Sequence, residues 1–251
     1  MTRMPDNFFD LSQRVASKLG YSLMPAETLV RHPQASYLRR VFADWRITGV
    51  IDVGANEGQY HDFIRDDVGF TGPVVSAEPI PALAAQISGG ASRTSNWRVE
   101  CVAMGPQSGS SSFRVTAGSQ FSSFLEPLES TRTQFYGQTS VEESITVAVD
   151  TLDALIDRHS TFLGDRIYLK MDTQGFDLEA LKGLTHRMDR VVALQSEASV
   201  KPVYHAMPHF TETIRTIEGL GYTISQIFPN NDGNFPLLIE FDCHFVRLPA
   251  P

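Results

Sequence analysis

Short apolar runs alternate with helical segments along most of this 251-residue chain. The clearest run, at residues 50–53, is followed by a turn with two glycines and then by a helical segment at 59–67. Apolar runs at 74–77 and 97–102 continue the alternation, with a helical segment between them. Strands that alternate with helices are typical of βαβ units, which build a mainly parallel sheet with helices on both faces. The sequence therefore predicts an α/β fold.

The alternation resumes after residue 149 and continues almost to the end of the chain. We expect helices at 152–159, from 176 onward and at 210–219, strands at 167–171 and 191–195, and a closing antiparallel pair at 222–228 and 243–248. The whole chain then predicts about seven strands in one sheet.

The stretch 108–149 interrupts this pattern. It is rich in Ser, Thr and Gly, and it contains two strand-like segments at 113–116 and 144–149. We interpret it as a segment inserted after the third strand, at the sheet edge or as a lid, because long insertions in compact domains are often functional. The alternative is a plain antiparallel extension of the sheet edge with a disordered tip.

Two amphipathic helical stripes precede the first strand, at 8–19 and 37–45, with a loop at 23–33 between them. We predict an N-terminal helical cap at 1–48 and a main domain at 49–251. The cap offers a surface on which a homodimer could form.

The composition excludes several classes of protein. The net charge of −8 and the absence of a basic stretch interleaved with aromatic residues disfavour nucleic acid as a partner. No run approaches the roughly 18 consecutive apolar residues of a membrane span, and residues 1–19 lack the apolar run of a signal peptide. Two isolated cysteines cannot build a disulfide framework. We expect a cytoplasmic protein.

The turn after the first strand indicates a nucleotide-cofactor site. Its pattern is Asp52-x-Gly54-x-Asn56-x-Gly58, whereas a dinucleotide fingerprint is GxGxxG. A carboxylate at the strand end repels a pyrophosphate and suits the ammonium of a methionine moiety. Glu78 ends the next strand, where an acid accepts hydrogen bonds from ribose hydroxyls. Its alternative role is an N-terminal charge for the following helix. These residues together favour S-adenosylmethionine over NAD.

An ordered set of motifs resembles the FkbM-type methyltransferases. The set is Ile51-Asp52-Val53-Gly54-Ala55-Asn56-Glu57-Gly58-Gln59, Glu78-Pro79, Ala103-Met104-Gly105, Ser122-Ser123, Val149-Asp150-Thr151-Leu152-Asp153, Leu169-Lys170-Met171-Asp172-Thr173-Gln174-Gly175 and Asp242-Cys243-His244-Phe245-Val246. The resemblance spans about Val50 to Arg247. It implies a Rossmann-like methyltransferase fold and transfer of a methyl group from S-adenosylmethionine, commonly to an oxygen of a sugar or secondary metabolite.

The resemblance also implies which residues contact the cofactor. The methionine end would be lined by the glycine turn, the ribose held by Glu78, and the adenine flanked by Ala103 and Met104 after the third strand. The alternative for Ala103 and Met104 is a place in the core at the strand end. The predicted cofactor contacts are Asp52, Gly54, Ala55, Asn56, Gly58, Gln59, Glu78, Pro79, Ala103, Met104 and Asp172.

Three residues are the candidates for catalysis. Asp172 ends the strand at 167–171 and is the first candidate to orient the acceptor or to accept its proton. Its alternative role is to cap the helix that begins near Gly175, and the two roles can coexist. Glu197 follows the next strand, and His205 lies in a loop. Of the seven histidines, His61 and His205 are the two to test.

The predicted substrate contacts are Ser122, Ser123, Gln174 and Tyr204. Gln174 departs from the family pattern, which usually has Glu, and an amide cannot accept a proton at neutral pH. Carboxylates and a histidine are able to hold a divalent metal, but no HxxxH or DxD spacing supports one, so we predict no metal site.

The sequence thus predicts an S-adenosylmethionine-dependent O-methyltransferase that acts on a hydroxyl of a small molecule or glycan. Three alternatives stay open at this point: methylation at nitrogen, a module that binds the cofactor without catalysis, and an NAD-dependent oxidoreductase. No nucleophile motif such as GxSxG favours covalent catalysis.

Overall fold

The main sheet has seven strands and forms the centre of the molecule. The structure, a computed structural model, describes residues 6–21, 23, 29–229 and 236–248, with the backbone alone at 6–10 and 13. The strand order is β3-β2-β1-β7-β8-β10-β9. The bounds are β1 (Gly49–Val53), β2 (Val74–Ala77), β3 (Trp97–Glu100), β7 (Ile167–Met171), β8 (Val191–Ser199), β9 (Thr223–Pro229) and β10 (Glu240–Val246).

The sheet is parallel except at one edge. Strands β3, β2, β1, β7 and β8 pair in parallel, while β10 pairs antiparallel with both β8 and β9. The chain runs outward from β1 through β2 to β3 and then returns to start the other half at β7, on the other side of β1. A crevice opens at the carboxyl ends of the strands where the direction reverses, and ligands of open α/β sheets bind there. The predicted seven-stranded, mainly parallel sheet is confirmed.

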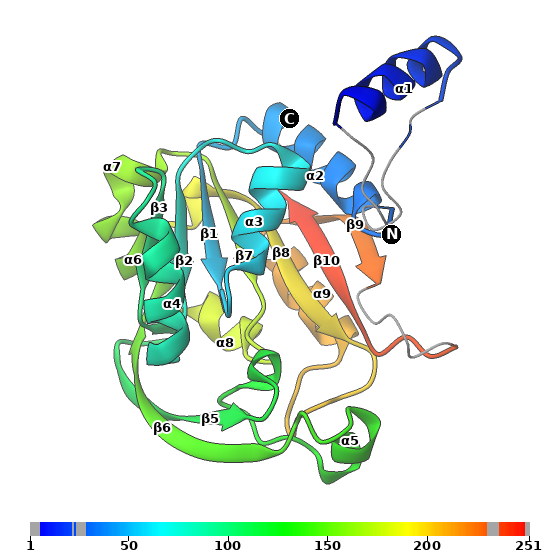
Figure 1. Ribbon diagram of the computed structural model, residues 1–251. Coiled ribbons are helices and arrows are strands. Elements are labelled where there is room, and N and C mark those ends of the chain that lie inside the picture. The colour runs from blue at the N-terminus through cyan, green and yellow to red at the C-terminus, as the bar shows by residue number, and fades with distance from the viewer. Residues whose placement is uncertain (1–5, 22, 24–28, 230–235, 249–251) are drawn as a thin grey trace.

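Helices cover both faces of the sheet and give it two cores (Figure 1). One face packs against α2 (His32–Asp44), α3 (Gln59–Phe63) and α4 (Pro81–Ala91). The other packs against α6 (Leu152–Arg158), α7 (Ser160–Leu163), α8 (Asp177–Lys182) and α9 (Phe210–Gly219). Since alternate side chains of a strand point to opposite faces, all five residues of β1 and all five of β7 are buried.

Local sequence signals set several of the helix starts. Thr151 precedes α6, and its hydroxyl accepts a hydrogen bond from the backbone N–H of Ala154, as an N-cap does. Pro81 opens α4, where a missing backbone N–H costs nothing. Gly58 precedes α3 with φ +87°, a conformation that favours glycine. A π-helical turn, Ile64–Val68, follows α3 directly.

The inserted segment forms a sheet of its own. It contains β5 (Gly109–Thr116), the helix α5 (Glu129–Gln134) and β6 (Val141–Asp150), and the sheet is completed by β4 (Ala103–Met104). The alternative of a plain antiparallel extension of the main sheet edge is therefore wrong. The third predicted strand ends at Glu100, and the chain then enters β4, which pairs with β6 and not with β2. Figure 1 shows this sheet below the carboxyl ends of the main strands.

The predicted N-terminal helix is present as α1 (Asp6–Lys18), and it projects away from the rest of the molecule (Figure 1). Its residues Leu11 and Val15 are exposed. The second predicted helix, α2, belongs to the core instead, with Leu38 and Val41 buried against the sheet. Within the described ranges, no helix combines the length and the apolar character that crossing a membrane requires.

Candidate active site

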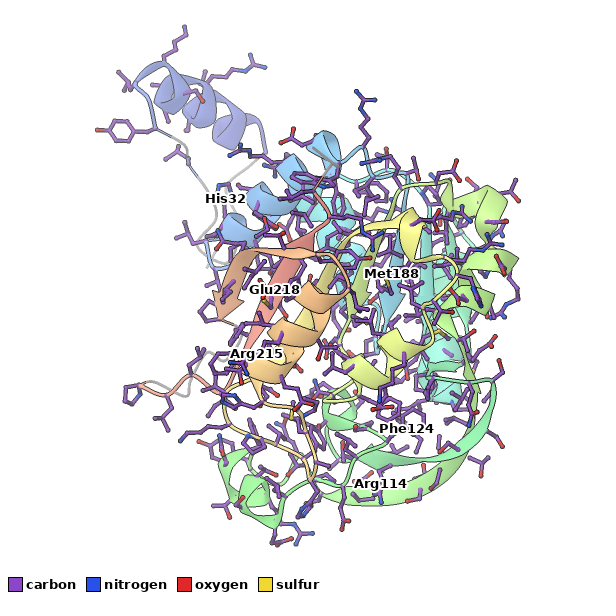
Figure 2. The ribbon with its side chains drawn as sticks, turned by 180° about the vertical axis from the view of Figure 1, so that it is seen from behind. His32, Arg114, Phe124, Met188, Arg215 and Glu218 are labelled. Carbon is purple, nitrogen blue, oxygen red and sulfur yellow. The ribbon has the colours of Figure 1, made fainter. Side chains whose placement is uncertain are left out.

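A cavity of about 770 Å³ opens at the carboxyl ends of the parallel strands. Its floor comes from the residues that end or follow β1, β2 and β7 and from the last part of β8. The insertion supplies its far wall, including Phe113 and Phe124. Figure 2, seen from behind, shows Phe124 and Arg114 on the inserted segment below the main sheet. The volume lies in the range of small-molecule and cofactor sites.

The turn after β1 brings the backbone close to the strand end of β7. Gly54 has φ +75°, and a Cβ there would lie 2.0 Å from the carbonyl oxygen of Asp172. Only glycine fits both the backbone conformation and the space. Gly54, Ala55, Asn56 and Gln59 line the cavity as predicted.

Glu78 lies beside this turn and links it to the next strand. Its Oε2 accepts the backbone N–H of Asn56 at 2.7 Å, and its Oε1 accepts that of Ile80 at 2.9 Å. Burial raises the pKa of Glu78 to about 7, and the two N–H groups oppose that shift. Each carboxylate oxygen keeps a second lone pair for a ligand hydroxyl. Glu78 therefore both lines the cavity and supports the turn before α4.

Asn56 has an acceptor without a partner. Its side-chain oxygen Oδ1 is buried and has no hydrogen-bond partner among the described residues. The residue is held at φ +47° and lines the cavity. A buried polar atom without a partner is costly in a protein interior. We call the turn at residues 54–58 the glycine cradle. Together with Glu78 and the Asn56 oxygen, it fits a ligand with hydroxyl and amino donors, as the nucleoside and methionine parts of S-adenosylmethionine have.

Asp52 lies beneath the cavity and does not line it, contrary to the prediction. It is fully buried, and its Oδ1 lies 3.0 Å from the Nζ of Lys170 on the neighbouring strand β7. Burial alone would lower the pKa of Lys170, but the carboxylates of Asp52 and Asp172 outweigh it and raise that pKa. Lys170 also donates to the carbonyl oxygen of Gly54 at 3.1 Å. Asp52 thus holds the cation that supports the glycine turn.

Asp172, Gln174 and Glu197 form a connected polar group at the ends of β7 and β8. The side-chain nitrogen of Gln174 donates to Asp172 Oδ1 at 2.9 Å and to Glu197 Oε2 at 2.8 Å. Lys170 Nζ lies 3.6 Å from Asp172 Oδ2. Burial, with Glu240 nearby, raises the pKa of Glu197. All three predicted residues line the cavity, and the amide at 174 supplies two donors where a carboxylate would supply none.

Two predicted substrate residues contact Gln174 instead of the cavity. Ser123 donates to the backbone oxygen of Gln174 at 2.8 Å. The hydroxyl of Tyr204 lies 2.9 Å from Gln174 Oε1 and 2.8 Å from the carbonyl oxygen of Phe121. Both residues are buried and neither lines the cavity. Because Gln174 is held at φ +53°, these contacts fix an otherwise unfavourable backbone conformation.

The histidines and Gly58 lie away from the cavity. His205 is exposed, and its backbone N–H bonds to the carbonyl oxygen of Glu126. His61 is buried and stacks on Trp97 with ring centroids 3.6 Å apart. A Cβ on Gly58 would lie 3.2 Å from Trp97, so this glycine serves packing. The geometry therefore offers no contact between these residues and a ligand in the cavity.

The predicted capping role of Asp172 is wrong, because α8 begins later than expected. Phe176 stands at the N-cap of α8 and provides no side-chain cap. Asp177 is the carboxylate that organises this turn: its Oδ1 accepts the backbone N–H of Thr173 at 2.8 Å, and its Oδ2 accepts the Ser196 hydroxyl at 2.7 Å. Asp172 keeps a partly exposed side chain that faces the cavity.

Pro79, Ala103, Met104 and Ser122 line the cavity as predicted. Ser122 also accepts the backbone N–H of Thr116 at 3.1 Å, so it supports the insertion. The apolar surface at this side includes Ile80 and Val102. Flat apolar walls of this kind suit a nucleobase.

The sequence analysis missed the part of the cavity formed by α2 and β10. Glu240 and Asp242 at the start of β10 line it, together with Gln34 of α2 and Gln195 of β8. Gln34 donates to Asp242 Oδ2 at 2.9 Å across 208 residues of sequence. Asp242 stands in a motif that the sequence analysis quoted, but nothing local predicts that α2 packs beside it. Within the described part of the chain, no group of three or more His, Cys, Asp or Glu residues has metal-binding geometry.

The fold and the cavity define an α/β protein with a nucleotide-type site at the switch point of its sheet. A model of the methyltransferase FkbM domain matches residues 52–224, more than half of the chain. The chain therefore belongs to the FkbM methyltransferase family, and the predicted family is confirmed. No curated protein matches the sequence.

Several solved structures are similar to this chain. Methyltransferase FkbM from Methylobacillus flagellatus KT is 16% identical, with a TM-score of 0.49. The alignment covers 79% of this chain and 43% of that one, so the chain spans less than half of that protein's length. The O-methyltransferase from Bacillus cereus in complex with SAH is 9% identical over 97% of this chain and 92% of that one, with a TM-score of 0.47. A SAM-dependent methyltransferase from Aquifex aeolicus is 13% identical over 98% and 100% of the two chains, with a TM-score of 0.41.

Proposed function

We propose that the cavity binds S-adenosylmethionine and that the chain transfers its methyl group to a hydroxyl of a small molecule or glycan. The single observation that carries this is the placement of the Asp172–Gln174–Glu197 group beside the glycine cradle and Glu78 in one cavity. Binding and proton-handling groups then meet at the switch point of the sheet. A cytoplasmic location, the division at residue 48 and a homodimer stay predictions.

The residues divide into a binding group and a reacting group. Gly54 lets the turn approach a ligand, Asn56 Oδ1 accepts a donor from it, and Glu78 accepts a hydroxyl. The bound cofactor supplies a methyl group on a sulfonium. Its transfer is an in-line displacement, so the protein mainly has to align the acceptor and take up its proton.

Asp172 is the residue that we assign to the acceptor hydroxyl. It is the more exposed carboxylate of the group, with 39% of its side chain accessible. Lys170 and the Gln174 amide each contact one of its oxygens, which orients the carboxylate toward the cavity. Glu197 lies deeper and is held through the same amide. We therefore assign proton uptake to Asp172 and a supporting role to Glu197.

The substitution Asp172→Asn tests this assignment. We expect turnover to fall by about 10²–10⁴-fold, the usual contribution of a general base, while the affinity for S-adenosylhomocysteine changes much less. Turnover is measured with labelled cofactor, and mass spectrometry with fragmentation locates the methyl group on oxygen or nitrogen. The exposed carboxylate Glu57 of the same cradle provides the control Glu57→Gln. Unchanged turnover in Asp172→Asn would contradict the assignment.

A further inference from the structure

The β8–β10 end of the cavity carries three carboxylates on one face of the sheet. Glu197 of β8 lies directly opposite Asp242 of β10 in the antiparallel pair, and Glu240 lies two pairs further along, opposite Ser199. Residues two apart on a strand point to the same face, and opposite residues are neighbours. All three carboxylates line the cavity. We call Glu197, Glu240 and Asp242 the acidic wall.

The basic residues at the cavity are committed elsewhere or stand at its rim. Lys170 lies 3.0 Å from Asp52 and 3.6 Å from Asp172, and Arg31 is exposed. Neutral amides contact the acidic wall: Gln34 donates to Asp242 and Gln174 donates to Glu197. Over the described ranges, no ion pair joins Glu240 or Asp242 to a basic side chain.

Glu240 provides a separate observation that points to a ligand. It is only 8% exposed, and its Oε1 is buried with no hydrogen-bond partner within the described part of the chain. A buried polar oxygen without a partner costs free energy, and a carboxylate costs more than a neutral group. A donor from a molecule in the cavity would remove that cost.

The cofactor cradle lies well away from Glu240. The cradle follows β1 and β2, and Glu240 lies in β10, three strand positions from β1 and four from β2 in the order β2-β1-β7-β8-β10. At about 4.8 Å between neighbouring strands, these separations are about 14 Å and about 19 Å. The cavity thus has a cradle end at β1 and β2 and an acidic end at β8 and β10, with Asp172 between them.

We propose that the acidic wall binds a positively charged amine of the acceptor, so that the substrate class is an amino sugar or another amino alcohol that carries both an ammonium and the hydroxyl to be methylated. This inference rests on the proposed function, since it assigns the acceptor to the same cavity. An ammonium provides three N–H donors and a positive charge, which matches the unpartnered Glu240 oxygen and its acidic neighbours. An anionic acceptor, such as a sugar phosphate, is disfavoured by the same charges.

The raised pKa values of two residues of the acidic wall agree with a positive charge that a ligand would supply. Burial, with acidic neighbours, raises the pKa of Glu240 to about 8 and that of Asp242 to about 6. A cation placed against these carboxyl groups favours their charged forms and lowers both pKa values.

A matched panel of probes tests the proposal on the full chain. The probes are glucosamine with N-acetylglucosamine and galactosamine with N-acetylgalactosamine, and each pair differs mainly in the positive charge. Saturation-transfer NMR measures their binding to wild type, Glu240→Gln, Asp242→Asn and the control Glu218→Gln, with and without saturating S-adenosylhomocysteine. Glu218 is exposed on α9, the helix that covers one face of the sheet (Figure 2).

We expect each amine to bind about tenfold or more tightly than its acetylated partner, since one charged contact accounts for about that factor. Glu240→Gln and Asp242→Asn should reduce this preference about tenfold, while Glu218→Gln leaves it unchanged. Equal binding within each pair, a preference that survives both wall substitutions, or no binding of any amine would overturn the proposal. Binding of S-adenosylhomocysteine is titrated separately, so that a failure of the proposed function is distinguished from a failure of the acidic wall.

Discussion

The two ends of the cavity are built by different means. The cradle end is built mainly from backbone contacts. A glycine turn approaches β7, and the oxygens of Glu78 accept hydrogen bonds from backbone N–H groups. At the acidic end side chains from β8, β10 and α2 meet, and Glu240 keeps an oxygen without a partner. On our proposal, the first end binds the cofactor, while the second end, which is built from side chains, selects the acceptor.

The largest expected effect is at the cradle. Gly54→Ala places a Cβ 2.0 Å from the Asp172 carbonyl oxygen at φ +75°. We expect a loss of about 2–4 kcal/mol in the free energy of unfolding and loss of cofactor binding, because the strand ends of β1 and β7 must separate. Urea denaturation and calorimetry measure the two effects. Gly89 of α4 is the control: nothing lies within 4 Å of its Cβ position, so Gly89→Ala should stabilise slightly. Equal stabilities of the two variants would contradict the description of the cradle.

The next effect lies at the junction between the two ends. Gln174→Glu, which introduces the usual family residue, replaces two N–H donors by a third carboxylate between Asp172 and Glu197. We expect about 1–3 kcal/mol of destabilisation at pH 8, the cost of leaving buried groups unpaired, and partial recovery at pH 5, because burial raises the pKa of Glu197 and favours its neutral form. Chemical denaturation at both pH values measures this. Gln134→Glu on the surface of α5 should show neither effect, and the same stability of Gln174→Glu at both pH values would contradict the expectation.

Glu78→Ala tests the binding role of Glu78 at the cradle end. Loss of a charged hydrogen bond to ribose should weaken S-adenosylhomocysteine binding by about 1–3 kcal/mol. Isothermal calorimetry compares this variant with Glu57→Gln, whose exposed side chain belongs to the same turn region and should have little effect. Unchanged affinity in Glu78→Ala would remove Glu78 from the ribose role.

The pH dependence of stability is an effect spread over a range of conditions, and it sharpens the contrast between the ends. Glu240 has a pKa of about 8 in the folded protein against a usual 4.5, so the folded state binds more protons than the unfolded state between these values. The free energy of unfolding must therefore fall as the pH rises in that window, by up to about 1.4 kcal/mol per pH unit for each such proton. Glu78, with a pKa of about 7, contributes in the same direction. His244, whose pKa is lowered by burial from the usual 6.5 to about 3, opposes this slope near pH 6.5 and contributes little above about pH 7.5.

Glu240→Gln should make this slope shallower and raise the stability at pH 8, whereas Glu218→Gln should change neither. Thermal denaturation from pH 6.5 to 8 measures the slope. A slope that stays the same in Glu240→Gln would show that the acidic wall does not carry the raised pKa.

The contrast between the ends also explains what the sequence could predict. The cradle is local: strand, glycine turn and helix are contiguous, and Glu78 follows the next strand, so Gly54, Asn56 and Glu78 were all placed in the cavity correctly. Asp172 and Gln174 stand in a quoted motif at the end of a strand, and Glu197 follows the next strand. Within these motifs the orientation of each side chain was not predictable, because Asp52 points under the turn toward Lys170 while Asp172 points into the cavity.

The rest of the site and of the fold could not be predicted from the sequence, because it depends on contacts between distant segments. Gln34 and Asp242 meet across 208 residues, and the inserted strands pair with β4 instead of the main sheet edge. His205 is a residue that the sequence predicts as a candidate for catalysis, but it is exposed and lies outside the cavity. Periodicity and motifs do not carry this information, because it depends on how helices and loops pack in three dimensions.

The central claim is that the cradle end binds S-adenosylmethionine, and one titration tests it most directly. Calorimetric titration of the full chain with S-adenosylhomocysteine, with NAD as the control, should give micromolar binding of the first and none of the second. The Asn56–Glu78 cradle lacks the GxGxxG turn for a pyrophosphate and has acceptors for hydroxyl and amino donors. No binding of S-adenosylhomocysteine, or comparable binding of NAD, would contradict this account of the site.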